Sequence, residues 1–334
     1  MRMIKLFKSL IEDAQTIVIT THIQPDADGI GSEIALCYAL RTLGKNVICV
    51  NEEKLLDRYL YLDPKNLIYS HKEYQELIKD EKFPKSVDLF IVTDTNSLAR
   101  IGPQVQKVVT HTENLLFIDH HPTPQELAAI HCIDTTMAAT GELVGNLIES
   151  IGVPFTKEMA LAMYTAILID TSSFRYPTVT ADTHRLIAKL MDTGVDPPEA
   201  YNRIYGTKKV DYMKMLGLVL SDINATENGQ VGWMKITEEI LEKYNVDSED
   251  THGLINHLLI LDNIKVALMF RQIDHKVKIS FRSAGDIDVG VMAQALGGGG
   301  HDHSAATLIE GELTSVIEKT IPKIELMLSK VLGK

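Results

Sequence analysis

Cysteine is scarce in this chain of 334 residues, which contains only three, none of them in a Cys-x-x-Cys pair. Cys37, Cys49 and Cys132 each lie in an apolar run, as is typical of small buried side chains. This usage argues against a disulfide-stabilised scaffold and against a structural zinc site built on thiolates. We therefore expect three reduced, buried thiols in a reducing compartment.

Basic residues and long apolar runs are also in short supply. Lys and Arg total 33 against 45 Asp and Glu, a formal net charge of −12, which argues against a protein that grips long duplexes by a basic face. No segment approaches the ~18 uninterrupted apolar residues of a membrane helix. The first 15 residues, MRMIKLFKSLIEDAQ, lack the long apolar core of a signal peptide. We expect a cytoplasmic protein without a membrane partner.

Strand-like apolar runs alternate with helical patterns in the first half of the chain. Residues 16–22, 46–50, 87–94 and 114–121 have the length and composition of buried strands. Residues 30–44 have a helical period and end at Gly44, a natural helix terminus. The alternation predicts an α/β fold whose parallel sheet carries helices on both faces. After about residue 135 the pattern is mostly helical.

A polar, turn-rich stretch, NATENGQ from Asn224, introduces a second region. The segments VGWMKI, KVALMFRQ and KVKISFRS that follow it have strand patterns, and the chain closes with a long helical pattern. We predict a smaller α+β domain here. The predicted parts are residues 1–190, a helical connector at 191–224, and residues 225–334.

Acidic residues and histidines follow several of these apolar runs. Any one of them is more often a helix cap or a turn former than a ligand. Parallel sheets bind ligands beyond the carboxyl ends of their strands, and clustered carboxylates resist ionisation unless a cation is present. Taken together they predict a divalent metal site built from His22, Asp26, Asp28, Asp94, Asp119, His120, His121 and Asp170.

The type of ligand indicates the metal and the chemistry. Mostly Asp with one or two His suits Mn²⁺ or Mg²⁺, with Fe²⁺ or Co²⁺ as alternatives. The set is large enough for two ions, and two ions about 3.5–4 Å apart can activate water and hold a phosphoryl oxygen. The sequence therefore predicts phosphoester hydrolysis.

A glycine run near the C-terminus, GGGGHDHSAAT at 297–307, is a candidate anion site. Its backbone N–H groups can approach a phosphate closely because no side chain intervenes. A glycine run of this kind is a flexible connector as often as it is an anion site. Its neighbours His301 and Arg282 favour substrate binding.

The motifs HIQPDADGIGS, VTDTN, IDHH and AILIDT, in this order, resemble the four motifs of the DHH phosphoesterase superfamily. The segments DTHGLINHL, KISFRS and GGGGHDHSAA resemble the DHHA1 domain of its nucleic-acid and nucleotide branch, and the whole chain is similar to the oligoribonuclease and pAp phosphatase (nanoRNase) subfamily.

The resemblance implies two Mn²⁺ ions with Asp94 as the shared ligand. The first ion would be held by His22, Asp26 and Asp94, and the second by Asp28, Asp94, His120 and Asp170. Asp119 would orient a neighbouring histidine, and His121 would face the substrate phosphate, as an acid. The implied substrate-binding residues are Arg282, Gly297, Gly298, Gly299, Gly300 and His301.

Three departures from the family pattern bear on substrate preference. The glycine motif lacks its usual final Gly and gains an imidazole at His303. His252 stands where an acidic residue is usual, and the fourth motif reads DTSSF where DTG is common. None of these changes a predicted metal ligand.

The function expected from the resemblance is a Mn²⁺-dependent phosphoesterase of short RNA, linear dinucleotides such as pGpG, or 3′-phosphoadenosine 5′-phosphate (pAp). The alternatives are a cyclic-dinucleotide phosphodiesterase, an inorganic pyrophosphatase or polyphosphatase, and a nucleotide sensor without catalysis. A homodimer is left open.

Overall fold

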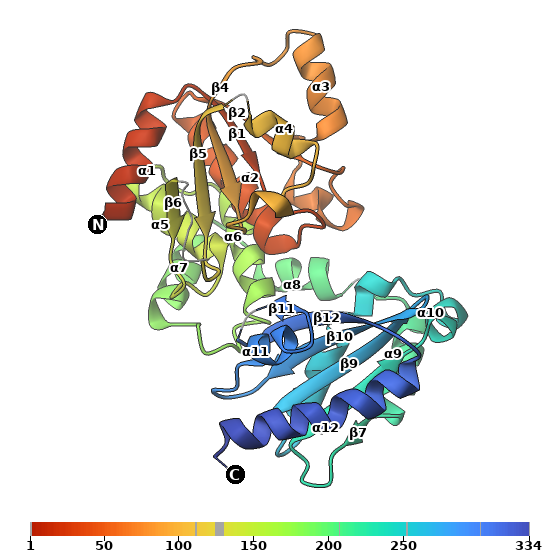
Figure 1. Ribbon diagram of the computed structural model, residues 1–334. Helices are drawn as coiled ribbons and strands as arrows, with labels where there is room; N and C mark the ends of the chain where they lie inside the picture. The colour runs from red at the N-terminus through yellow and green to blue at the C-terminus, as the bar shows by residue number, and fades with distance from the viewer. Residues whose placement is uncertain are drawn as a thin grey trace. The chain divides into compact units, whose positions relative to one another are not determined.

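The computed structural model describes residues 2–110, 112–123, 130–206, 208–251, 253–300 and 302–333. The chain divides into two compact units, an N-terminal unit of residues 1–207 and a C-terminal unit of residues 208–334 (Figure 1). Two residues singled out in the sequence, His252 and His301, lie outside the described residues. Within the described residues, none of the helices combines the length and the apolar character that a bilayer crossing requires.

A six-stranded sheet forms the centre of the N-terminal unit, with strand order β3-β2-β1-β4-β5-β6. Every neighbouring pair is parallel, as predicted. The strands are β1 (Thr16–Thr20), β2 (Asn46–Asn51), β3 (Ile68–Ser70), β4 (Val87–Thr93), β5 (Thr112–Asp119) and β6 (Ile130–Ile133). Their continuous apolar runs are explained by burial on both sides of the sheet.

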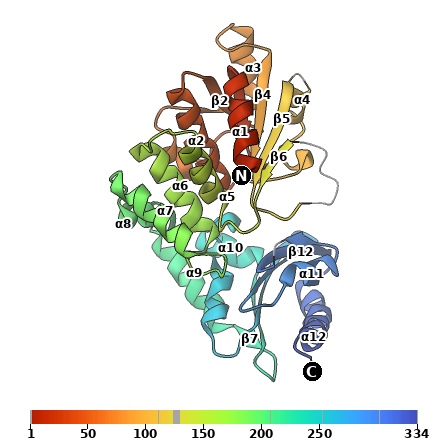
Figure 2. The same ribbon diagram turned by 90° about the vertical axis from the view of Figure 1, so that its left-hand side faces the viewer.

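Helices cover both faces of this sheet (Figures 1 and 2). One face packs on α1 (Arg2–Asp13), α2 (Ala27–Thr42), α5 (Thr140–Ser150) and α6 (Lys157–Asp170). The helices α7 (Ala181–Asp192) and α8 (Pro197–Tyr205) add to the same core. The other face packs on α3 (His71–Lys79) and α4 (Val105–Val109). Residues 27–40 of α2 are all buried because the sheet, α5 and α6 surround this helix.

The C-terminal unit has a mixed six-stranded sheet with strand order β11-β12-β10-β9-β8-β7. Only the β8–β9 pair is parallel among the described strands of this sheet. The strands are β7 (Asn224–Ala225), β8 (Val231–Ile236), β9 (Val266–Ile273), β10 (Lys276–Ser283), β11 (Gly299–Gly300) and β12 (Ser304–Glu310). The expected α+β architecture is therefore present.

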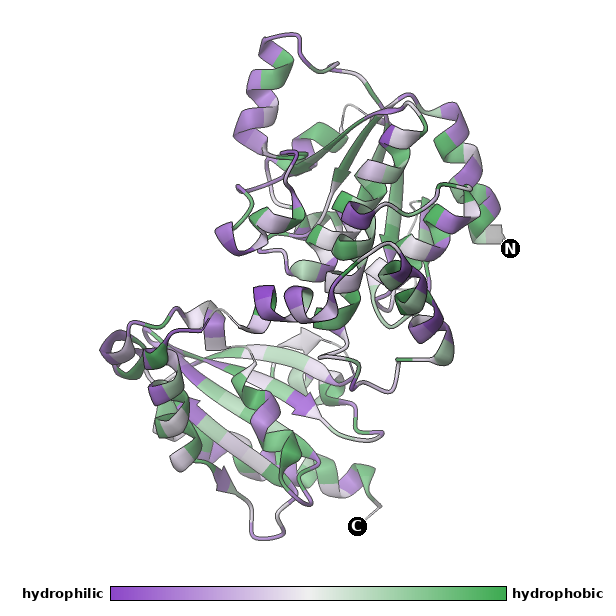
Figure 3. Ribbon diagram, turned by 180° about the vertical axis from the view of Figure 1, so that it is seen from behind, coloured by the Kyte–Doolittle hydropathy of each residue, from purple (hydrophilic) through white to green (hydrophobic). Residues whose placement is uncertain are grey.

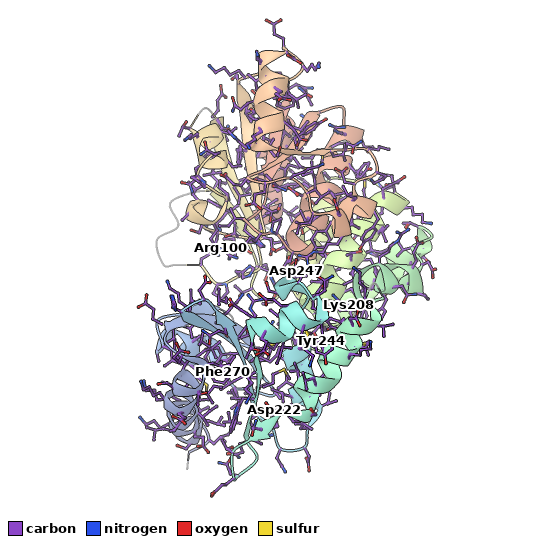
Figure 4. The ribbon with its side chains drawn as sticks, turned by 90° about the vertical axis from the view of Figure 1, so that its right-hand side faces the viewer. Arg100, Lys208, Asp222, Tyr244, Asp247 and Phe270 are labelled. Carbon is purple, nitrogen blue, oxygen red and sulfur yellow. The ribbon has the colours of Figure 1, made fainter. Side chains whose placement is uncertain are left out.

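Two layers of helices enclose the second sheet. One face packs on α11 (Val289–Gln294) and α12 (Leu313–Val331). Phe270 of β9 belongs to the core between this face and these helices (Figure 4). The other face packs on α9 (Val210–Ser221), α10 (Glu238–Tyr244) and the 3₁₀ segment η4 (Leu254–Ile260). Of the connector predicted at 191–224, α8 belongs to the first unit and α9 to the second. Hydrophobic residues are found in the strands and in the helices packed against them (Figure 3).

Candidate metal centre

The N-terminal unit brings the predicted metal ligands together at the carboxyl edge of its sheet. His22 and Asp26 follow β1, Asp94 follows β4, and His120 follows β5. Asp28 lies in the first turn of α2, and Asp170 is the last residue of α6. These residues form two groups, His22 with Asp26 and Asp94, and Asp28 with His120 and Asp170. In each group, every residue has one potential ligand atom that lies within 4.8 Å of those of the other two. A third such group combines Asp94, His120 and His121.

The start of α2 explains the position of Asp26 and Asp28. Asp26 caps the helix, since its Oδ1 accepts hydrogen bonds from the N–H groups of Asp28 at 2.9 Å and Gly29 at 3.3 Å. A Cβ on Gly29 would lie 2.2 Å from Oγ1 of Thr21, so only glycine lets the helix begin this close to the end of β1. Asp28 is thereby buried beside the strand ends.

Asp94 occupies a left-handed backbone conformation, with φ of +60°. Such a conformation is costly for most residues, is tolerated best by Asn and Asp among non-glycine residues, and is concentrated at functional sites. The N–H of Asp94 donates to Ile118 O at 3.0 Å, which holds the turn on β5. The carboxylate lies with Oδ2 3.4 Å from Nε2 of His22.

The hydrogen bonds of His22 and His120 fix which ring nitrogen faces the carboxylates. Nδ1 of His22 donates to Ile23 O at 2.8 Å, and Nδ1 of His120 donates to Met137 O at 3.2 Å. Because a carbonyl can only accept, the neutral rings carry their proton on Nδ1. Each Nε2 then presents a lone pair on the side of the acidic cluster. Nε2 of His120 lies 3.3 Å from Oδ2 of Asp170 and 3.9 Å from Oδ2 of Asp28.

The N-terminus of α5 is a part of the site that the sequence did not reveal. The N–H groups of Thr140 and Gly141 donate to the two oxygens of Asp28, both at 2.8 Å. The hydroxyl of Thr140 donates to Oδ1 of Asp94 at 2.9 Å. A small polar residue at the start of a helical pattern is too common to be singled out, and here it positions two predicted ligands from opposite sides.

Burial and mutual repulsion dominate the electrostatics of the acidic cluster. Burial raises the pKa of Asp28 well above its usual value, and the charges of Asp94 and Asp170 add to this. Burial also raises the pKa of Asp170, to about 6. Asp94 differs: burial would raise its pKa, but His22, which in its protonated form also donates from Nε2, and the charges of His121 and His120 outweigh burial and hold the pKa of Asp94 below its usual value.

The donor set fits a divalent cation. In the described part of the chain, neither Lys nor Arg forms an ion pair with any of these carboxylates. Two atoms that each lie ~2.1 Å from one cation at a right angle are ~3 Å apart, close to the His–Asp separations found here. A cation would offset the repulsion that raises the pKa values of the carboxylates. The cluster could therefore hold metal ions through imidazole nitrogens and carboxylate oxygens.

Asp119 and His121 form a tight pair at the same edge. Oδ1 of Asp119, which is fully buried, lies 2.6 Å from Nδ1 of His121 and also accepts from its backbone N–H at 3.2 Å. Burial alone would lower the pKa of His121, but the hydrogen bond that its Nδ1–H donates to Asp119 and the charge of Asp94 raise it to about 9. Asp119 thus orients the His121 ring and favours its protonated form.

A strained turn follows Asp170. Ser172, Ser173 and Phe174 have φ values of +49°, +65° and +62°, three consecutive left-handed residues without a glycine. Thr171 holds the turn by accepting from the N–H of Phe174 at 2.9 Å. Arg175 closes it, with Nε donating to Ser172 O at 2.7 Å and Nη2 to Ser172 Oγ at 2.8 Å. The positive φ of Ser172 explains why glycine is common at this place in the DTG motif.

The described substrate-binding residues predicted for the C-terminal unit lie on β10, on β11 and in the turn before β11, and β12 separates the two strands. Arg282 is on β10 opposite Ser304 of β12, and its Nη1 donates to Phe281 O at 2.9 Å. Gly299 and Gly300 form β11, paired with Ala306 and Ala305 of β12. Gly297 turns the chain with φ of +83°, and a Cβ on Gly298 would lie 2.2 Å from Ala306 O. The glycine run is therefore a turn and an edge strand packed on backbone.

His303 has a defined hydrogen bond in this region. Its Nδ1 lies 2.9 Å from Oγ of Ser283, whose hydroxyl donates to Ile287 O at 2.5 Å. The ring nitrogen is consequently the donor to Ser283. This imidazole is held on the face of β10 opposite to Arg282, because successive residues of a strand point to opposite faces.

Comparison with known proteins gives the family. The model of the DHH family, N-terminal domain, matches residues 16–167, and the model of the DHHA1 domain matches residues 230–329. The bifunctional oligoribonuclease and PAP phosphatase NrnA of Thermus thermophilus is 31% identical, over 92% of this chain and 89% of that protein. The NrnA of Bacillus subtilis is 26% identical, over 86% of this chain and 87% of that protein.

Solved structures agree with the family models. The crystal structure of an exopolyphosphatase-related protein from Bacteroides fragilis superimposes with a TM-score of 0.88 at 26% identity, covering 98% of both chains. RecJ of Thermus thermophilus in complex with Mn²⁺ shares the fold, with a TM-score of 0.53 at 12% identity, over 98% of this chain and 54% of that chain. The chain therefore belongs to the DHH/DHHA1 phosphoesterase family and is a hydrolase of phosphoester bonds with the His/Asp cluster of that family.

Proposed function

We propose that this protein is a Mn²⁺-dependent phosphoesterase that hydrolyses short oligoribonucleotides and linear dinucleotides, with pAp as a further substrate. The observation that carries the proposal is the convergence of His22, Asp26, Asp28, Asp94, His120 and Asp170 on one sheet edge, where, among the described residues, the carboxylates have no ion pair with Lys or Arg. The names of the similar NrnA proteins support short nucleotides as the substrate class.

The proposed ligands divide between two ions. His22, Asp26 and Asp94 hold one, and Asp28, Asp94, His120 and Asp170 hold the other. A shared Asp94 is supported by its place in two of the ligand groups, one with His22 and Asp26 and one with His120 and His121. Two ions held there would lower the pKa of a bound water and offset charge on the phosphoryl oxygens.

Residues of the chain itself provide the remaining steps. Water adds to phosphorus as the bond to the ester oxygen breaks, and this departing oxygen needs a proton. We assign that proton to His121, because the Nδ1–H of its ring is held by Asp119, whose carboxylate favours the protonated imidazole. In the C-terminal unit, Arg282 offers a planar fork of donors to phosphate. We assign the same part of the substrate to the glycine run 297–300 and His301, although the N–H groups of Gly297 and Gly298 already donate to Gln294 O at 3.0 Å and Ala293 O at 2.8 Å.

A substrate panel tests the proposal. Purified protein with Mn²⁺ is assayed on pGpG, pApA, a longer RNA, cyclic dinucleotides, pAp and pyrophosphate, each with and without EDTA. We expect turnover of the short linear substrates and of pAp, abolished by the chelator. Turnover of pyrophosphate alone, or binding of nucleotides without turnover, would contradict the proposal.

Two pairs of variants test the assigned residues. Asp94→Ala should abolish turnover, whereas Asp88→Asn should not, because Asp88 lies on the same strand but its carboxylate binds the N–H groups of Gln15 and Thr16 at the opposite end. A folded Asp94→Ala protein with wild-type turnover would contradict the two-ion site.

The second pair addresses the C-terminal unit. Arg282→Ala should keep its metal content but lose at least about tenfold in kcat/KM on a dinucleotide, equal to about 1.4 kcal/mol. Lys276→Ala, an exposed change at the other end of β10, is the control. Equal kinetics for these two variants would remove Arg282 from the site.

A further inference from the structure

Glu33 is a buried acid that the proposed reaction does not use. It lies on α2 in the apolar core with no exposed surface. One carboxyl oxygen, Oε1, accepts a hydrogen bond from Nδ2 of Asn51 at 2.7 Å. The other, Oε2, has no hydrogen-bond partner in the described part of the chain. An apolar side chain would fill this space at lower cost, so the presence of an acid here needs a reason.

The partner of Glu33 links it to the edge of the sheet. Asn51 is the last residue of β2 and is buried. Its Oδ1 accepts from the N–H of Thr21 at 3.3 Å and from the hydroxyl of Thr20 at 3.2 Å. The Asn51 amide can present either its oxygen or its nitrogen to β1. The acceptor on Glu33 selects the orientation in which the nitrogen faces Glu33 and the oxygen faces the Thr21 N–H.

This chain of hydrogen bonds ends beside two predicted metal ligands. Thr21 immediately precedes His22. The carbonyl of Thr20 accepts from the hydroxyl of Thr93 at 3.1 Å, and Thr93 immediately precedes Asp94. These hydrogen bonds thus connect the C-terminal ends of β2, β1 and β4, next to His22 and Asp94 in the sequence. Metal–ligand distances in such sites lie within about 0.2 Å of their usual values, so hydrogen bonds that fix these strand ends bear on metal binding.

We propose that Glu33 is a positioning residue for the metal centre, which acts through Asn51 to fix the end of β1 that carries His22. This inference rests on the proposed function. Burial raises the pKa of Glu33 well above its usual value, and the hydrogen bond from Asn51 offsets only part of that effect. The side chain therefore works as a neutral acceptor, a role that glutamine can take over.

The test compares two variants of Glu33 in the full-length protein. Mn²⁺ affinity is measured by titration calorimetry on metal-free protein, together with thermal unfolding of the same samples. Glu33→Leu removes the acceptor and should weaken Mn²⁺ binding by about tenfold or more, the usual range for a lost hydrogen bond behind a ligand. Glu33→Gln retains the acceptor and should bind Mn²⁺ within about threefold of the wild type.

A control separates positioning from loss of packing. Leu36→Ala removes a fully buried side chain on the same helix and should lower the unfolding temperature without changing Mn²⁺ affinity. If Glu33→Leu does not fold, Asn51→Ala breaks the same chain of hydrogen bonds from its other end and should weaken Mn²⁺ binding in the same way.

The outcomes distinguish this inference from the proposed function. A folded Glu33→Leu protein, or its Asn51→Ala substitute, with wild-type Mn²⁺ affinity would overturn the positioning role and leave the phosphoesterase standing. Equal weakening in Glu33→Gln and Glu33→Leu would overturn it as well, because a neutral acceptor would then not suffice. Wild-type protein that binds no Mn²⁺ would overturn both.

Discussion

At the scale of single residues, the predicted ligands are held by hydrogen bonds from groups that are not themselves predicted ligands. Thr140 makes two of these, with its N–H to Asp28 and its hydroxyl to Asp94. Thr140→Val keeps the shape but loses the hydroxyl, so we expect Mn²⁺ affinity to fall by about 10–100-fold, whereas Thr140→Ser should restore it. Calorimetric titration of the metal-free variants measures this.

The matched control for Thr140 is Thr42→Val. Thr42 lies at the end of α2, and its hydroxyl bonds only within the helix, to Tyr38 O at 3.0 Å. Its loss should leave Mn²⁺ affinity unchanged. If Thr140→Val and Thr42→Val bind Mn²⁺ equally well, the α5 N-terminus has no role in holding the site.

The raised pKa of Glu33 makes the stability of the protein depend on pH. Above its usual pKa of 4.5 this acid is ionised in the unfolded chain but still protonated in the folded one. The folded state then binds the extra proton, so the wild type loses stability as pH rises, by about 1.4 kcal/mol per pH unit until the folded-state pKa is reached. The Glu33→Gln variant has no titratable group at this position and therefore lacks this contribution to the pH dependence of stability.

Urea unfolding of the wild type and of Glu33→Gln, at several values between about pH 5.5 and about pH 7.5, checks this dependence. The variant should gain stability relative to the wild type as pH rises. If the unfolding free energies of the wild type and of Glu33→Gln change in parallel with pH over this range, Glu33 is ionised in the folded protein.

At the scale of elements, the contact between α2 and α6 sets the distance between Asp28 and Asp170. Gly31 makes this contact possible, because a Cβ there would lie 2.3 Å from Ala162 O of α6. Gly31→Ala must push the two helices apart. We expect a loss of about 1–3 kcal/mol in unfolding free energy and weaker Mn²⁺ binding.

A second glycine within a helix is the control for Gly31. Gly217 of α9 has nothing within 4 Å of the position of a Cβ. Gly217→Ala should therefore stabilise the protein by about 0.4–1 kcal/mol and leave Mn²⁺ binding unchanged. Equal stability changes in the two variants, by urea unfolding, would contradict the close contact between α2 and α6.

The elements also show what the sequence could and could not predict. The parallel sheet was predictable because its apolar runs are continuous, and the grouping of His22, Asp94 and His120 followed from the common direction of parallel strands. The hydrogen bond from Thr140 to Asp28 was not, because it joins residues 112 positions apart and leaves no local pattern. The glycine run was expected to bind an anion through its backbone N–H groups. Its pairing with β12 was not predictable, because it depends on a partner strand that composition does not specify.

At the scale of the whole molecule, charge bears on the length of the substrate. The net charge of −12 repels a polyanion, and each added nucleotide brings one more negative charge. A dinucleotide needs only the metal centre and a few donors such as Arg282. A longer RNA would have to lie along more of the surface of a protein whose net charge repels it.

This argument predicts an unusual dependence on salt. At low ionic strength, kcat/KM should be at least about tenfold higher for a two-residue RNA than for a ten-residue RNA, a difference of about 1.4 kcal/mol. Added KCl shortens the screening length from ~14 Å at ~0.05 M to ~5–6 Å at ~0.3 M, so repulsion of the longer RNA should weaken and the ratio should narrow. Steady-state kinetics on both substrates at fixed Mn²⁺ measure the ratio. A nucleic-acid enzyme with a basic track behaves in the opposite way, because salt displaces its long substrates most strongly. A ratio that widens with salt would therefore place a cationic path for RNA on this acidic protein and would contradict the preference for short substrates argued from its charge.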